Sequence, residues 1–270
     1  MKLHRWASAA TAAAAIAGLS AFSAPAAAGQ MHASGAAVDY VALGDSYSSG
    51  VGAGAYDPGS GNCKRSTKAY PELWRAANSP SSFAFTACSG ARTTDVTAGQ
   101  LGPLNTATDL VTISIGGNDA GFGDTMTTCV TQGESRCLER VAQARAYISG
   151  TLPGRLDAVY GAIRAKAPSA RVLVLGYPRM YQLKGECKAG ISEKSRAAIN
   201  AASDDLSGVT AKRAADHGYG YGDVRPDFTG HEICSAAPWL HSVSYPVDES
   251  YHPTASGQSG GYLPVMSDSL

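Results

Sequence analysis

The sequence carries no excess of charge of either sign, which excludes the partners that a strong net charge would attract. Its 270 residues include 22 lysines and arginines and 22 aspartates and glutamates, so the formal net charge is zero. Proteins that bind nucleic acid present a basic patch or stripe, and none is visible along this chain. We therefore expect no nucleic-acid partner.

Long hydrophobic runs are also absent, except at the N-terminus. There, Lys2 and Arg5 precede an alanine-rich run over 7–22, and the small residues Ala26–Ala28 follow. Alanine is weakly apolar, and the run is broken before it reaches the ~20 strongly apolar residues that a membrane span needs. The pattern is typical of a secretory signal peptide over residues 1–28, and it predicts a secreted, extracellular protein.

The rest of the sequence has no internal repeat and no low-complexity segment. The full chain is 44% hydrophobic and is long enough to bury one large core. We expect 29–37 to be a disordered lead-in and 38–270 to form a single domain.

Cysteine pairs at metal-binding spacing are missing too. No Cys-x-x-Cys occurs and no histidine lies at a zinc-finger spacing, so we expect no metal site. An even number of cysteines downstream of a signal peptide suggests disulfides, although many pairings are possible. The local pairing 63–88, 129–137 and 187–234 closes the smallest loops. We predict this pairing for the six cysteines, Cys63, Cys88, Cys129, Cys137, Cys187 and Cys234.

Short runs rich in β-branched residues predict the strands of a sheet. These runs are Val38–Leu43, Ser82–Thr86, Asp109–Ile115, Arg171–Gly176 and a weaker Tyr219–Val224. The third and fourth are continuously apolar, as expected of central parallel strands that are buried on both faces.

Helical patterns alternate with these strands. Apolar residues recur at steps of three and four from Leu138 to Ile163, and we expect Pro153 to kink or divide this helix. A second apolar stripe follows Ser192, a candidate N-cap. The alternation predicts an α/β fold with a parallel central sheet and helices on both sides. Active sites of such folds lie at the carboxyl ends of the strands.

Polar residues follow the first three predicted strands, where they can meet at that edge. Ser46 follows the first strand, Gly90 the second and Asn118 the third. A serine hydroxyl is a weak nucleophile, so it needs a general base and an oxyanion hole. His252, near the C-terminus, is the candidate base. Each residue taken alone is explained by a turn or a cap, but the set indicates nucleophilic catalysis.

The blocks that contain these residues resemble those of the GDSL, or SGNH, hydrolase superfamily. The blocks are Gly-Asp-Ser-Tyr from position 44, the glycine at 90, Gly-Gly-Asn-Asp from 116 and Tyr-His-Pro-Thr from 251. The wider sequence, including the cysteines and Pro-Trp-Leu-His from 238, resembles the secreted actinobacterial (Streptomyces-type) GDSL lipases and phospholipases. The resemblance implies a three-layer α/β/α, flavodoxin-like fold and hydrolysis of carboxylic esters without a cofactor.

Carried over motif by motif, the resemblance implies Ser46 as the nucleophile and His252 as the general base. The Gly90 N–H and the Asn118 side-chain amide, with the Ser46 N–H, would form the oxyanion hole. Donors set in place for a developing oxyanion are commonly the largest catalytic contribution, and the loss of one costs ~2.7–4 kcal/mol.

The sequence departs from the family at the third catalytic position. An aspartate usually stands three residues before the histidine, but this chain has Glu249 there, with Asp248 beside it. In the actinobacterial lipases that it resembles, a backbone carbonyl two residues before the histidine often orients the ring, here that of Ser250. We favour a Ser46–His252 dyad oriented by the Ser250 carbonyl, with Glu249 as the alternative third member.

The resemblance indicates a secreted, monomeric lipase or esterase that cleaves lipid acyl esters and makes transient contact with a lipid interface. Phe122, Trp239 and Leu240 are candidate apolar walls of its pocket. One alternative is a phospholipase A-type activity on glycerophospholipids. Another is a polysaccharide acetylesterase on the same fold. The non-enzyme alternative is a secreted lipid- or carbohydrate-binding module.

A second serine lies in a motif that imitates a nucleophile elbow. Ser259 stands in Gly-Gln-Ser-Gly-Gly, but no strand is predicted before it and no histidine follows it. We expect a turn that enters a helix there. The remaining histidines of the domain, His217, His231 and His241, have no catalytic block and are expected to be structural or solvated.

Overall fold

The computed structural model describes residues 38–184, 187 and 190–270. The predicted signal peptide and lead-in lie outside the described residues and stay predictions. No helix of the described part is long and apolar enough to cross a membrane.

The core of the domain is a parallel sheet. Its strands are β1 (Asp39–Gly44), β2 (Ser82–Phe85), β3 (Leu110–Ser114), β4 (Arg171–Leu175) and β5 (Gly220–Gly222). They are ordered β2-β1-β3-β4-β5, and every neighbouring pair is parallel. Every residue of β3 is buried, as predicted for a central strand covered on both faces. The predicted strands are confirmed, with ends shifted by at most a few residues.

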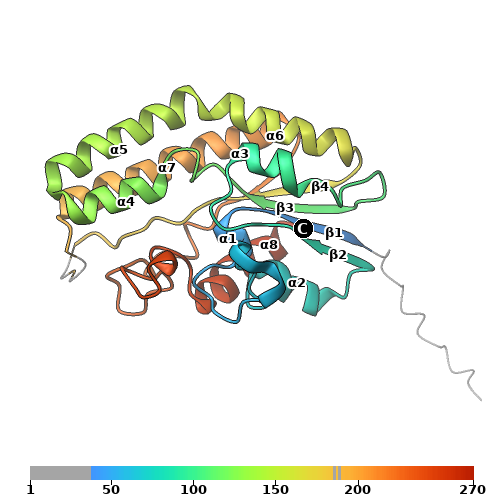
Figure 1. The fold of residues 1–270 in the computed structure, drawn as a ribbon, viewed down its shortest axis with the longest axis horizontal. Helices are drawn as coiled ribbons and strands as arrows, with labels where there is room; N and C mark the ends of the chain where they lie inside the picture. The colour runs from blue at the N-terminus through green and yellow to red at the C-terminus, as the bar shows by residue number, and fades with distance from the viewer. Residues whose placement is uncertain (1–37, 185–186, 188–189) are drawn as a thin grey trace, which may run out of the picture. The chain divides into compact units, whose positions relative to one another are not determined.

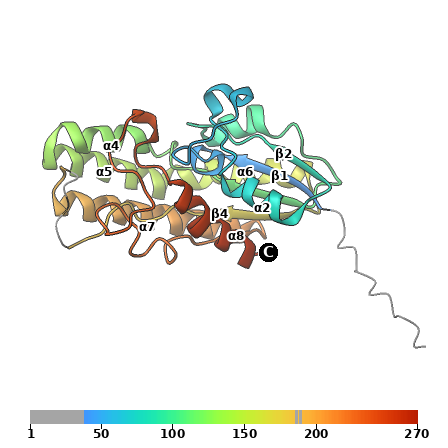
Figure 2. The same cartoon turned by 90° about the horizontal axis from the view of Figure 1, so that it is seen from below.

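Helices cover both faces of the sheet and produce three layers (Figure 1). The upper layer in that view contains α3 (Thr93–Asp95), α4 (Phe122–Thr131), α5 (Gly133–Gly150), α6 (Leu152–Lys166) and α7 (Glu193–Asp216). On the other face, α2 (Tyr70–Asn78) and α8 (Leu263–Asp268) lie next to each other (Figure 2). The short α1 (Ser46–Ser49) directly follows β1. The remaining helical segments of the described part are short 3₁₀ helices at η1 (Pro58–Cys63) and η3 (Val247–Glu249) and short π-helices at η2 (Val96–Gln100) and η4 (Gly257–Tyr262).

Two local sequence signals set the ends of the long helices. The apolar stripe from Leu138 to Ile163 is divided between α5 and α6, and Pro153 lies in the first turn of α6. Proline is tolerated there because the N–H that it lacks has no partner within the helix in any case. Ser192 caps α7 by accepting a hydrogen bond from the backbone N–H of Ser195 at 3.2 Å. Both predictions are confirmed.

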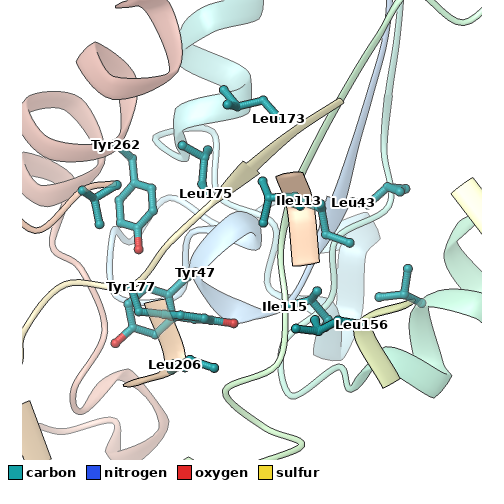
Figure 3. Packing of buried hydrophobic residues seen from close by; sticks show 14 of the residues in the cluster. Leu43, Tyr47, Ile113, Ile115, Leu156, Leu173, Leu175, Tyr177, Leu206 and Tyr262 are labelled. Atoms are coloured by element: carbon teal, nitrogen blue, oxygen red, sulfur yellow. The ribbon is translucent and has the colours of Figure 1, made fainter. Parts of the chain in front are cut away.

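The apolar side chains between the layers form a continuous core that holds the strand ends in place. Figure 3 shows Ile113, Leu173 and Leu175 of the strands in this core, together with Leu156 of α6. All four are essentially inaccessible to solvent. A close-packed interior of this kind resists small displacements, so the loops at the carboxyl edge start from fixed positions.

Three disulfides cross-link segments around the sheet, and their pairing is the local one that we predicted. The pairs are Cys63–Cys88, Cys129–Cys137 and Cys187–Cys234. The first ties η1 to the loop after β2, which carries Gly90, and the second joins α4 to α5. Two loops near the predicted active edge are therefore covalently constrained.

Candidate active site

The candidate nucleophile lies in a tight turn between β1 and α1. Gly44 has a φ of +126°, and a Cβ there would lie 2.6 Å from the Ser114 carbonyl oxygen, so only glycine fits. Asp45 then caps α1 by accepting a hydrogen bond from the Tyr47 N–H at 3.0 Å. Ser46 is thereby fixed as the first helical residue at the carboxyl end of β1.

The candidate base reaches this serine from the far end of the chain. Nε2 of His252 lies 2.8 Å from Oγ of Ser46, although 206 residues separate them in sequence. The Tyr47 hydroxyl donates a hydrogen bond of 2.6 Å to the Tyr251 carbonyl and so attaches the histidine loop to α1. Burial lowers the pKa of His252 to about 4, which keeps the imidazole neutral and able to accept a proton near neutral pH.

The second imidazole nitrogen faces a backbone carbonyl. Nδ1 of His252 lies 3.0 Å from the Ser250 carbonyl oxygen. The two nearby carboxylates have other partners: Glu249 accepts a hydrogen bond from Tyr56 at 2.7 Å, and Asp248 pairs with Lys64. An N–H on Nδ1 leaves Nε2 as the acceptor that faces Ser46.

The two predicted oxyanion-hole residues border the same groove as Ser46 and His252. Nδ2 of Asn118 donates one hydrogen to the Ala91 carbonyl at 3.0 Å, which orients the amide and leaves its second hydrogen for another acceptor. Gly90 adopts a left-handed backbone with a φ of +77°. The predicted edge of the sheet therefore brings all four residues together.

Asp119, the last residue of the Gly-Gly-Asn-Asp block, connects the loops that carry Gly90 and Asn118. Its carboxylate accepts hydrogen bonds from the Thr93 N–H at 3.0 Å and from the Thr93 hydroxyl at 2.6 Å. The loop after β2 is thus fixed to the loop after β3. The relative position of Gly90 and Asn118 depends on this contact.

Beneath the candidate nucleophile lies a buried polar network that the sequence analysis missed. The Asp45 carboxylate accepts hydrogen bonds from the Tyr177 hydroxyl and, at 2.8 Å, from the Ser114 hydroxyl. Tyr177 in turn accepts the Gly117 N–H at 3.3 Å, next to Asn118. Burial raises the pKa of Asp45 to about 6. The available signal was the position of Tyr177 just after β4, at the same edge of the sheet.

An open, mainly apolar groove of about 390 Å³ extends from the Ser46–His252 pair. Phe122 borders it, as we predicted, and also borders a smaller pocket of about 40 Å³ that Ser46 lines as well. The prediction that Trp239 and Leu240 form pocket walls is wrong. Trp239 stacks on His231 with ring centroids 3.7 Å apart, and Leu240 is buried in the core.

The other sequence candidates lie outside this arrangement. Ser259 is in η4 rather than after a strand, and its hydroxyl donates to the Ser256 carbonyl. His217 lies 3.1 Å from Asp157, and His241 contacts the Gly52 carbonyl at 2.8 Å. These histidines have structural partners. Within the described part of the chain, no three histidine, cysteine, aspartate or glutamate side chains are grouped as a metal site.

A serine and a histidine in hydrogen-bond contact, with amide donors close by, are the arrangement used by serine hydrolases. Residues 42–259 match the GDSL-like Lipase/Acylhydrolase family. The chain therefore belongs to this family, and the membership predicted from the sequence blocks is confirmed. The fold class that the resemblance implied is confirmed as well.

Characterised relatives cover most of the chain. It is 70% identical to a lipase of Streptomyces rimosus over 230 aligned residues. The aligned region covers 85% of this chain and 86% of the relative. A crystal structure of the extracellular lipase from Streptomyces rimosus has a TM-score of 0.86 and 68% identity, covering 87% of this chain and all of that one. Phospholipase A1 from Streptomyces albidoflavus NA297 has the same TM-score and coverage at 64% identity.

Proposed function

We propose that this chain is a secreted serine hydrolase that cleaves the acyl esters of lipids. The observation that carries the proposal is the 2.8 Å contact between Ser46 Oγ and His252 Nε2 at the head of an apolar groove. The groove suits a hydrocarbon chain, and the contact provides an activated nucleophile at its end.

In the proposed reaction, Ser46 Oγ attacks the ester carbonyl while His252 Nε2 takes the hydroxyl proton. The carbonyl oxygen becomes an oxyanion that the Ser46 and Gly90 N–H groups and the free Asn118 amide hydrogen stabilise. The tetrahedral intermediate then expels the alcohol, which receives the proton from His252. Water attacks the acyl-enzyme with His252 again as base, and the fatty acid leaves as Ser46 regains its proton.

We assign the orientation of the imidazole to the Ser250 carbonyl. Its oxygen accepts the Nδ1–H, which fixes the tautomer and stabilises the imidazolium that forms during the reaction. The 3.0 Å distance supports this role, and the hydrogen bond from Tyr56 to Glu249 supports leaving the carboxylate outside the catalytic unit. The site then works as a dyad.

The groove favours lipid acyl esters over the acetyl groups of polysaccharides. An acetyl group has one methyl carbon to bury, whereas this groove offers about 390 Å³ next to the nucleophile. The relatives named lipase and phospholipase A1 support acylglycerols and glycerophospholipids alike as substrates. A non-catalytic binding module would not require the contact between Ser46 and His252.

Export is supported by two independent observations. Disulfides form and persist in oxidising compartments, and this chain has three of them. The lipase of Streptomyces rimosus is extracellular. Together with the N-terminal sequence pattern, these observations support a site of action outside the cell.

Hydrolysis of p-nitrophenyl esters with two to sixteen acyl carbons tests the activity. We expect the highest kcat/KM for chains longer than acetyl, and activity of Ser46→Ala at least ~10³-fold lower. Equal rates for the two proteins would overturn the proposal. A preference for acetate over longer chains would favour the acetylesterase. Parallel assays with a triglyceride and with a mixed-chain phosphatidylcholine separate lipase from phospholipase activity.

A further inference from the structure

Exposed apolar side chains are concentrated at the mouth of the groove. Among the described residues, the large apolar side chains that are exposed are Val130, Leu183, Val243, Tyr245 and Val247. Three of these, Val130, Val243 and Val247, border the groove that contains Ser46, and Tyr245 lies between the last two in the chain. We call Val130, Val243, Tyr245 and Val247 the rim patch. Clustered exposed apolar groups of this kind mark interaction sites.

Three side chains of the rim patch are largely exposed to solvent. Tyr245 is 94% exposed, Val247 71% and Val243 55%. Val247 belongs to η3 and Val130 to α4, and both side chains border the groove. Side chains from two separate elements therefore surround one opening. The transfer of each of these side chains from water to an apolar phase lowers the free energy.

The charges around the groove favour a neutral partner surface. Among the described residues that border the groove, Asp248 is the one aspartate, glutamate, lysine or arginine, and Lys64 pairs with it. The opening therefore offers neither a free cation for anionic headgroups nor a free anion for cationic groups. Tyrosine suits a lipid surface because its ring is apolar while its hydroxyl stays among the headgroups.

We propose that the rim patch docks the enzyme on the surface of a zwitterionic lipid aggregate. An acyl chain then passes from the aggregate into the groove without crossing water, because the groove opens within the patch. This inference rests on the proposed function, since it concerns how the same site reaches its substrate. It assigns to Tyr245 a role in docking and none in the chemical step, because Tyr245 does not border the groove.

Tryptophan fluorescence tests the docking directly. Tyr245→Trp is made in the Ser46→Ala background, so that no turnover alters the lipid, and phosphatidylcholine vesicles are added. We expect a blue shift of the emission as the indole enters the interface, after subtraction of the Ser46→Ala signal. Leu183→Trp in the same background is the matched control, because Leu183 is the exposed apolar residue that borders a different depression. It should show no shift.

A second pair of variants measures the consequence for activity. Tyr245→Ser should weaken vesicle binding and phosphatidylcholine hydrolysis by about fivefold, while Leu183→Ser should change neither. Hydrolysis of dissolved p-nitrophenyl butyrate by Tyr245→Ser should stay within about twofold of the unmodified protein. This contrast separates docking from catalysis.

Two outcomes would overturn the docking proposal. The first is an unshifted Tyr245→Trp spectrum together with unchanged vesicle binding by Tyr245→Ser. The second is a dimer in sedimentation experiments that Tyr245→Ser dissociates, because the patch would then bind a second copy of the chain. Failure of the proposed function would instead appear as absent ester hydrolysis, and vesicle binding by Ser46→Ala does not depend on it.

Discussion

The Tyr56 hydroxyl donates a hydrogen bond of 2.7 Å to the Glu249 carboxylate and accepts one from the Gly52 N–H at 2.9 Å. The Glu249 carboxylate therefore binds the loop after α1 and not the imidazole of His252. Glu249 thus connects that loop to η3. The acceptor that Nδ1 of His252 contacts is the Ser250 carbonyl oxygen.

The first prediction concerns this carboxylate. Glu249→Gln should retain kcat within about tenfold, because the substitution leaves the Ser250 carbonyl and its acceptor geometry unchanged. The measurement is kcat on a soluble ester. Asp248→Ala is measured in parallel, to test whether the neighbouring carboxylate substitutes for the missing one. A loss beyond about a thousandfold with an unchanged circular dichroism spectrum would make Glu249 the third member of a triad.

The second prediction follows from the burial of His252. Since burial lowers its pKa from the ordinary 6.5 to about 4, the neutral form that accepts the proton persists well below pH 6.5. Activity should therefore fall as the pH drops through about 4, and it should remain high at pH values where an ordinary histidine is mostly protonated. The profile of kcat/KM against pH measures this, because it reports ionisations of the free enzyme.

A half-maximum at pH 6.5 or above would contradict this interpretation of His252. Asp45 is the other buried group to consider, because burial raises its pKa to about 6. An acid limb near pH 6 that disappears in Asp45→Asn would belong to that carboxyl. Circular dichroism at each pH shows whether the loss of activity reflects unfolding.

The third prediction concerns the buried network beneath the nucleophile. Tyr177→Phe removes a donor to the Asp45 carboxylate and an acceptor for the Gly117 N–H. We expect a lower kcat with little change in KM, because the Asn118 turn loses a support while the groove stays intact. The unpaired buried groups should also lower the free energy of unfolding by about 1–3 kcal/mol.

Tyr219→Phe is the matched control for this substitution. Tyr219 is as buried as Tyr177, at 6% exposure, and its hydroxyl donates to the Tyr160 carbonyl. The control should lower stability without lowering kcat. Equal kcat values for Tyr177→Phe and the unmodified protein would limit the network to a role in stability.

The fourth prediction isolates the oxyanion hole. Asn118→Ala removes the amide whose second hydrogen is free, so kcat should fall by about 10²–10³-fold while KM changes little. Thr127→Ala, at the border of the same groove but on α4, is the control and should keep kcat within about threefold. An equal loss in both variants would indicate general disturbance of the groove instead of loss of an oxyanion donor.

The sequence could predict the elements and blocks because their signals are local. The apolar runs of β3 and β4, the division at Pro153 and the order of the blocks along a parallel sheet all follow from neighbouring residues. A parallel sheet then brings the blocks together whatever their separation in sequence.

The supporting contacts could not be predicted in the same way. Tyr56 and Glu249 are 193 residues apart, and Asp45 and Tyr177 are 132 apart. No periodicity links either pair, since each contact depends on how separate loops are placed. Trp239 was misassigned for a related reason: its apolar character does not determine which surface it packs on, and it stacks on His231.

Covalent labelling is the most direct test of the central claim that Ser46 is the nucleophile. The protein is treated with a fluorophosphonate, digested and mapped by mass spectrometry. We expect a single adduct on the peptide that contains Ser46, formed slowly or not at all in His252→Ala because the base is then missing. An adduct on the peptide that contains Ser259, or labelling that persists in Ser46→Ala, would contradict the account.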